Sequence, residues 1–196
     1  MRLPRTPARR SVAFLRGINV GGHRATKEQL VAVFEQRGLT GVETFLASGN
    51  VMFDQDSAVE GGAVEGGAVD GTAMAAALEA ALGFPVPATV RTAEELAAID
   101  GQAPFSADEL EAATGTPQVV LLFDRTPAAV ATVVADAAAR SNDADLLRPA
   151  PSDLGAVFWL PVDGVSGSTL ERELLPLFGL HTVRTTNTVA RLLKKV

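Results

Sequence analysis

A glycine-rich, basic loop near the start of the chain carries the residue types that bind anions. It follows an apolar strand segment, and its candidate ligand-binding residues are Arg16, Gly17, Asn19, Gly21 and Gly22. Thr26 then begins a predicted helix, so loop and helix N-terminus together offer backbone N–H groups to a phosphate or a carboxylate. The guanidinium of Arg16 adds a planar pair of hydrogen-bond donors. The loop matches neither a P-loop nor a dinucleotide fingerprint, and the structural alternative is that its glycines serve only tight turns.

Two further polar segments lie at predicted turns. They are Ser48, Gly49 and Asn50 between two predicted strands, and Arg184, Asn187 and Thr188 before the predicted last helix. Taken singly, these residues are explained by hairpin-turn chemistry and by Asn187 capping the helix. Taken with the glycine-rich loop, they predict one site, in which Arg16 and Arg184 hold the same small anion between two halves of the chain.

The spacing of nucleophiles, bases and acids does not identify a catalytic residue. The chain has no cysteine, which excludes disulfides and thiolate metal sites. His23 and His181 lie far apart in the sequence, so a histidine-based metal site is not predicted. His23 is either a general base beside the loop or simply an exposed loop histidine. Whether the protein is an enzyme is left open, and neither a cofactor nor a metal is expected.

Charge is distributed unevenly along the chain, whose net charge is −6. Residues 1–10 contain four arginines and no acid, acidic residues fill the middle, and no acid follows Glu173. The acidic middle argues against a general nucleic-acid partner. The alternative function is a non-catalytic module that recognises RNA or a protein through its sheet, with Phe14 and Phe53 stacking on bases. The lack of a long apolar run and of a signal-peptide pattern predicts a cytoplasmic protein that does not enter the membrane.

The apolar periodicity predicts an α+β fold in which a β-α-β-β-α-β order occurs twice, as two tandem ferredoxin-like subdomains. The first subdomain is expected over residues 11–100, after a disordered basic tail at 1–10. The second is expected over 118–196, ends in a basic helix, and is joined to the first by a connector at 101–117. The segment 58–71 repeats AVEGG-like units without apolar periodicity, which predicts a flexible loop.

Five segments spread over the chain form a distinctive pattern. They are FLRGINVGG at 14–22, TFLASGNVMF at 44–53, VRTAEEL at 90–96, APF at 103–105 and TVRTTNTVARLL at 182–193. This pattern resembles the family catalogued as domain of unknown function 1697. The resemblance implies a bacterial α+β protein with two ferredoxin-like subdomains, and it supplies no established catalytic residue. Thr185 and Thr186 stand where the family has asparagine and tryptophan, so an aromatic contact made there in relatives would be lost.

Overall fold

The computed structural model describes residues 9–47, 49–55, 64–65, 68–140, 145–168 and 178–196. Contacts within the chain divide it into two compact units, Met1–Glu94 with Lys195–Val196 and Glu95–Lys194. The division therefore falls between Glu94 and Glu95, before the connector that the sequence predicts. Most of the expected tail and much of the expected loop at 58–71 lie outside the described residues.

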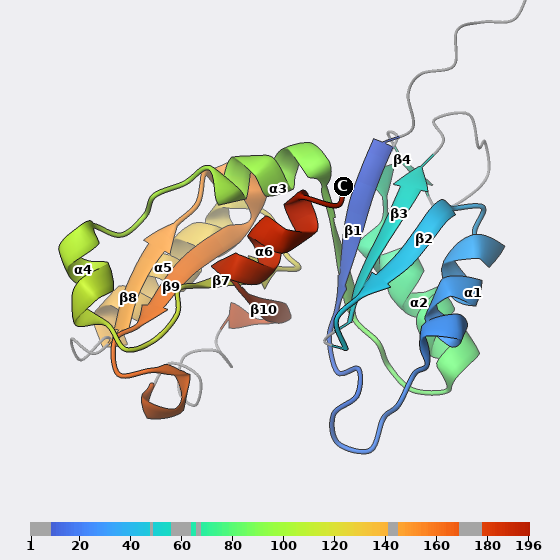
Figure 1. Cartoon of the computed structure of the whole chain (residues 1–196), viewed down its shortest axis with the longest axis horizontal. Coiled ribbons are helices and arrows are strands. Elements are labelled where there is room, and N and C mark those ends of the chain that lie inside the picture. The colour runs from blue at the N-terminus through green and yellow to red at the C-terminus, as the bar shows by residue number, and fades with distance from the viewer. Residues whose placement is uncertain (1–8, 48, 56–63, 66–67, 141–144, 169–177) are drawn as a thin grey trace, which may run out of the picture. The chain divides into compact units, whose positions relative to one another are not determined.

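The first unit is a four-stranded antiparallel sheet with two helices on one face (Figure 1). Its main elements are β1 (Arg9–Leu15), α1 (Lys27–Gln36), β2 (Thr40–Phe45), β3 (Asn50–Gln55), α2 (Gly71–Leu82) and β6 (Ala88–Thr92). The strand order is β2-β3-β1-β6. A two-residue ladder of β4 (Val64–Glu65) and β5 (Ala68–Val69) lies within the segment predicted to be a loop. Arg9 and Arg10, which the sequence assigns to the tail, belong to β1, because they continue its pairing with β3. The Arg10 side chain also donates hydrogen bonds to Asp54 and to the Gly41 carbonyl.

Alternation along β1 and β3 builds the core of the first unit. Ala13 and Leu15 lie on the same face as Val51 and Phe53 and pack with apolar side chains of α1 and α2. The start of α1 is confirmed, because Thr26 and Gln29 form the capping box that their spacing predicts.

Phe14 and Phe53, the base-stacking pair of the alternative function, do not share a face of the sheet. Phe14 pairs with Asn50 and Ser11 pairs with Phe53 across β1 and β3, which places the two phenylalanines on opposite faces of the sheet. Phe53 is fully buried, and its ring centroid lies 5.4 Å from that of Phe34. A sheet surface that stacks bases through both rings is therefore excluded.

The second unit contains another four-stranded antiparallel sheet, with the order β10-β7-β9-β8. Its elements are α3 (Ala93–Asp100, which begins two residues before the division), α4 (Ala107–Ala112), β7 (Gln118–Leu122), α5 (Pro127–Arg140), β8 (Asp145–Pro149), β9 (Ala156–Pro161), β10 (His181–Thr185) and α6 (Thr186–Leu193). Figure 1 shows α5 on one face of this sheet and α3 and α6 on the other. Val120 and Trp159 pack with Val130 and Val133 of α5. The protein is thus an α+β protein with two antiparallel sheets, as the sequence predicts.

The start of α6 differs from the prediction. Its N-cap is Thr185, whose hydroxyl oxygen accepts a hydrogen bond of 3.1 Å from the Thr188 N–H, while Asn187 is exposed in the first turn. The cap lies two residues earlier because β10 leads directly into α6. Thr186 N–H donates to the Pro117 carbonyl at 3.0 Å, which ties this junction to the start of β7.

Candidate functional site

The glycine-rich loop and the turn between β2 and β3 lie against each other in the first unit. The Asn19 amide Nδ2 donates to the Ala47 carbonyl at 3.1 Å, and Asn19 Oδ1 accepts from the Ala25 N–H at 3.5 Å. Leu15 N–H donates to the Gly49 carbonyl at 2.8 Å. Two of the three predicted polar segments are therefore brought together, with Asn19 and Gly49 at their contact.

A pocket of about 420 Å³ opens where these two segments meet, and we call it the loop pocket. One side consists of residues 18–19, 25–27 and 30, and the other of residues 44, 46–47 and 49–50. Lys27 brings a positive charge, whereas the described lining residues include no acid. Ser48 lies outside the described residues. The described lining of the loop pocket therefore carries a single charge, which is positive.

Further positive charge comes from the loop beside this pocket. Arg16, His23 and Arg24 are exposed, and no acid occurs between Ser11 and Lys27. The ring of His23 lies over that of Phe84, with 4.5 Å between the centroids. The predicted Arg16 site is thus placed next to the pocket, although Arg16 is not among the residues that line it.

Backbone conformation explains the loop glycines. Gly17, Gly21 and Gly22 have φ angles of 79°, 61° and 90°, a region that side chains other than glycine rarely adopt. A Cβ on any of the three would meet nothing within 4 Å, so the space beside them is open. Gly49 differs, because its Cβ would lie 3.0 Å from the Leu15 Cβ. Close packing of the turn on β1 therefore requires glycine there.

Two residues without the freedom of glycine also have positive φ, and both line the loop pocket. Asn19 and Leu46 each have a φ of 59°. Asparagine tolerates this conformation, but for leucine it is uncommon and costly. Leu46 is also 45% exposed. Sequence reasoning missed Leu46, because a leucine after a strand carries no signal of a left-handed backbone.

The N-terminus of α1 already holds negative charge at the edge of the loop pocket. The pKa of Glu28 is lowered because its carboxylate accepts a hydrogen bond from its own backbone N–H and a second one from the Thr26 side chain. Thr26 N–H also donates to Gln29 Oε1 at 2.9 Å. The start of α1 therefore carries a carboxylate beside the Lys27 ammonium, and hydrogen bonds are the main cause of the lowered pKa of Glu28.

The third predicted segment belongs to the second unit. Arg184 is buried in β10, where its guanidinium donates to the Thr182 hydroxyl at 2.7 Å and to the Val183 carbonyl at 2.8 Å. Burial lowers the pKa of Arg184 to about 10. Asn187 and Thr188 lie in the first turn of α6. Since Arg16 lies in the other unit, a shared anion stays a prediction.

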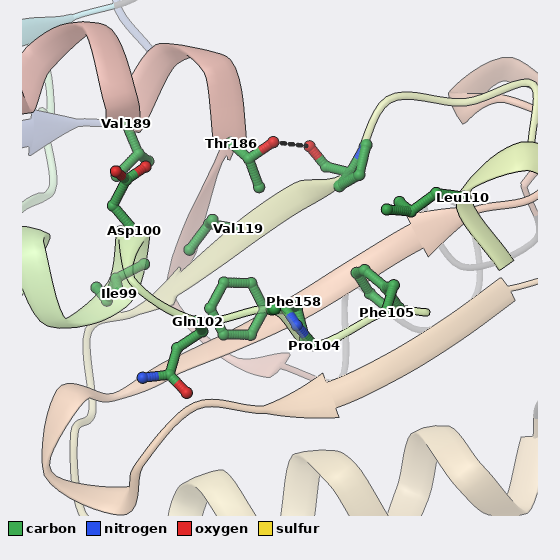
Figure 2. Close-up of a pocket in the computed structure, with 12 residues that line it drawn as sticks. Ile99, Asp100, Gln102, Pro104, Phe105, Leu110, Val119, Phe158, Thr186 and Val189 are labelled. Atoms are coloured by element: carbon green, nitrogen blue, oxygen red, sulfur yellow. Dashed lines mark hydrogen bonds between the residues drawn. The ribbon is translucent and has the colours of Figure 1, made fainter. Parts of the chain in front are cut away.

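A second pocket, of about 280 Å³, lies inside the second unit, and we call it the apolar pocket (Figure 2). Val119 of β7 and Phe158 of β9 form its floor, with Pro104 and Phe105 on one side and Val189 of α6 on the other. Thr186, at the position where the family resemblance expects tryptophan, is part of its wall. Sequence reasoning missed this pocket, because its residues come from segments that are far apart along the chain.

Histidine and acidic side chains are spread through the part of the chain that the structure describes. Within it, no three histidine, aspartate or glutamate side chains gather as they would around a metal ion. None of its helices is long and apolar enough to span a bilayer.

Comparison with known proteins agrees with this architecture. The sequence profile of the family described as "Protein of unknown function (DUF1697)" matches residues 9–148. A solved structure, that of the conserved bacterial protein SP0830 from Streptococcus pneumoniae, superposes with a TM-score of 0.67 at 19% sequence identity. The superposition covers 95% of this chain and 99% of that one, and at this identity it shows a shared fold alone. None of the curated proteins matches the chain.

Proposed function

Since the chain belongs to the DUF1697 family of proteins of unknown function, we propose its activity from the site itself: it binds a small anionic ligand, bearing a phosphate or a carboxylate, in the loop pocket. One observation carries this proposal. The two segments that the sequence singles out for polar chemistry meet at one pocket, whose described lining residues include Lys27 and no acid.

The charges around the loop pocket support an anion rather than a cation. Lys27 lies at the first position of α1, where unpaired backbone N–H groups and the helix macrodipole favour an anion. Arg16 and Arg24 are exposed in the adjoining loop. A phosphate or carboxylate placed there gains from these positive charges against the single Glu28 carboxylate beside them, and charge-assisted hydrogen bonds are stronger than neutral ones.

The shape of the loop pocket supports a ligand with an apolar part. Ile18, Leu30 and Leu46 line it together with the polar residues. Leu46 keeps a φ of 59° and remains 45% exposed beside this space. Residues held in such conformations cluster at ligand sites, where the surrounding structure maintains them.

Binding of inorganic phosphate provides the direct test. Phosphate should raise the melting temperature more than sodium chloride at the same ionic strength, because a ligand that binds only the folded state stabilises it. Lys27→Gln should remove most of this difference, and Lys194→Gln, an exposed lysine of the second unit, serves as the matched control.

The comparison between the two lysine variants separates binding from general salt effects. Phosphate also stabilises proteins by exclusion from their surface, and that effect is the same for both variants. If Lys27→Gln and Lys194→Gln respond to phosphate equally, the loop pocket does not hold the anion.

The subdomain fold, a ligand shared between the units and the location of the protein are further proposals. The strand order is the same in both units, which supports ferredoxin-like βαββαβ subdomains. A ligand shared between the units through Arg16 and Arg184, and a cytoplasmic location, stay predictions. The alternative of an RNA-binding sheet is weakened, because Phe53 is fully buried against Phe34.

A further inference from the structure

The floor of the apolar pocket is part of the core of the second unit. Val119 and Phe158 are 0% and 2% exposed and lie on the neighbouring central strands β7 and β9. Ile99 and Val189, at 1% each, close the pocket from α3 and α6. A cavity of about 280 Å³ is close to the smallest volumes of known ligand sites, roughly 300 Å³.

The walls of this pocket are held in place, so that they do not simply collapse into it. Thr186 is fixed twice to the Pro117 carbonyl, by its N–H at 3.0 Å and by its hydroxyl at 3.3 Å. The hydrogen bond of the hydroxyl is the dashed line in Figure 2. Helix α4 is fixed by a capping box between Ser106 and Glu109, and Glu109 also accepts a hydrogen bond of 3.0 Å from Arg148 of β8. The apolar pocket is therefore a preformed, half-open recess with an apolar floor, which is the usual form of a small-molecule site.

The rim of the apolar pocket offers hydrogen-bond acceptors. Asp100, at the end of α3, is exposed and is the charged residue among those described at the lining. The Gln102 Nε2 donates to the Ala98 carbonyl at 3.0 Å, which leaves the amide oxygen of Gln102 for a ligand. The Thr186 hydroxyl proton is directed to Pro117. A molecule in the pocket therefore meets apolar surface at the floor and negative charge at the rim.

We infer that the apolar pocket is a second binding site, which takes a small molecule with an aromatic or aliphatic body and a cationic amine. The body contacts Val119 and Phe158, and the amine lies at the Asp100 carboxylate. The same carboxylate repels the anionic ligands proposed for the loop pocket, so the two pockets select opposite charges.

Phenethylamine is a suitable probe, with 2-phenylethanol and 3-phenylpropionate as its neutral and anionic counterparts. In titrations of the full chain followed by ¹H–¹⁵N spectra, phenethylamine should bind most tightly and 3-phenylpropionate most weakly. The amide signals of Val119, Thr186 and Val189 should shift saturably. The absence of saturable shifts at these residues overturns the proposal, whatever any variant does.

Two substitutions separate the contributions of charge and shape. Asp100→Asn should weaken phenethylamine binding by about threefold, the size expected of an exposed ion pair, and should leave 2-phenylethanol unaffected. Thr186→Trp should fill the pocket and abolish the binding of both phenethylamine and 2-phenylethanol. Asp163→Asn, an exposed aspartate of the same unit outside the lining, is the matched control. Equal binding of the amine and the alcohol by the wild-type chain would show that Asp100 does not select charge.

Discussion

The loop pocket and the apolar pocket are built in different ways. Residues close together in the sequence, 18–30 and 44–50, form the first, mainly through loops and the start of a helix. Segments that extend from residue 99 to residue 189 form the second, through the inner side chains of strands and helices. The first has a lysine and no acid among its described lining residues, and the second has an aspartate.

Because the two pockets are built differently, substitutions in them should affect the stability of the protein differently. The loop pocket depends on backbone conformation, with Asn19 and Leu46 at positive φ and partly exposed to solvent. The apolar pocket depends on side chains that also form the core. Substitutions at the floor of the apolar pocket should therefore lower the free energy of unfolding strongly, whereas those at the loop pocket should have smaller effects, some of them favourable.

The largest effect is expected for Phe158→Ala. Phe158 is 2% exposed, and removing a buried phenylalanine typically costs about 3–5 kcal/mol in the free energy of unfolding. Because the ring already borders a cavity, we expect a value near the lower end, measured by chemical denaturation. Leu110→Ala, at the rim of the same pocket and 44% exposed, should cost less than about 1 kcal/mol. If both variants lost a similar free energy of unfolding, the floor and the rim of the pocket would not differ in their contribution to stability.

A smaller effect is expected for Asn19→Ala. Alanine loses the hydrogen bond to the Ala47 carbonyl and is strained at a φ of 59°, which together should cost about 1.5 kcal/mol. Asn19→Gly loses the same hydrogen bond without the strain but gains freedom in the unfolded chain, which costs roughly 0.5–1 kcal/mol, so it should be slightly more stable than Asn19→Ala. Denaturation of the two variants side by side measures the strain minus this entropic cost, and a less stable Asn19→Gly would show that the strain at Asn19 is smaller than that cost.

The contrast between the pockets also explains how much the sequence could predict. The capping box of Thr26 and Gln29, the left-handed glycines and the repeated strand–helix order depend on neighbouring residues, and local patterns indicate them. The apolar pocket depends on how Val119, Phe158 and Val189 come together in three dimensions, which periodicity does not encode. The cap of α6 was misplaced because three consecutive residues, Thr185, Thr186 and Asn187, all suit an N-cap.

Leu46→Gly should make the protein more stable. Glycine removes the strain of a leucine at positive φ, which stabilises the folded state by about 1–2 kcal/mol. It also gives the unfolded chain more conformational freedom, which lowers the free energy of unfolding by roughly 0.5–1 kcal/mol. We expect a net gain of about 0.5–1 kcal/mol in thermal or chemical denaturation, accompanied by weaker phosphate binding if Leu46 shapes the loop pocket. Val20→Gly, on the adjoining loop and 59% exposed, is the control and should gain nothing. A loss of stability in Leu46→Gly would mean that its side chain contributes more than its backbone conformation costs.

The smallest effect on the free energy of unfolding is expected for Glu28→Gln. Whether this variant is more or less stable than the wild-type chain depends on pH. The pKa of Glu28 is lowered in the folded protein by the hydrogen bonds from its own N–H and from Thr26, so its stabilising contribution is present above about pH 4.5 and is lost as the pH falls through the lowered value. Glu28→Gln should therefore be slightly less stable at neutral pH and should lose less stability on acidification.

The same substitution removes a negative charge from the start of α1, and it should tighten phosphate binding at the loop pocket by about twofold at low salt. Glu35→Gln, exposed in the last turn of the same helix, should leave phosphate binding unchanged. If both glutamine variants bind phosphate alike, the helix start does not contribute to the anion site, and the affinity must come from Lys27 and the arginines of the loop.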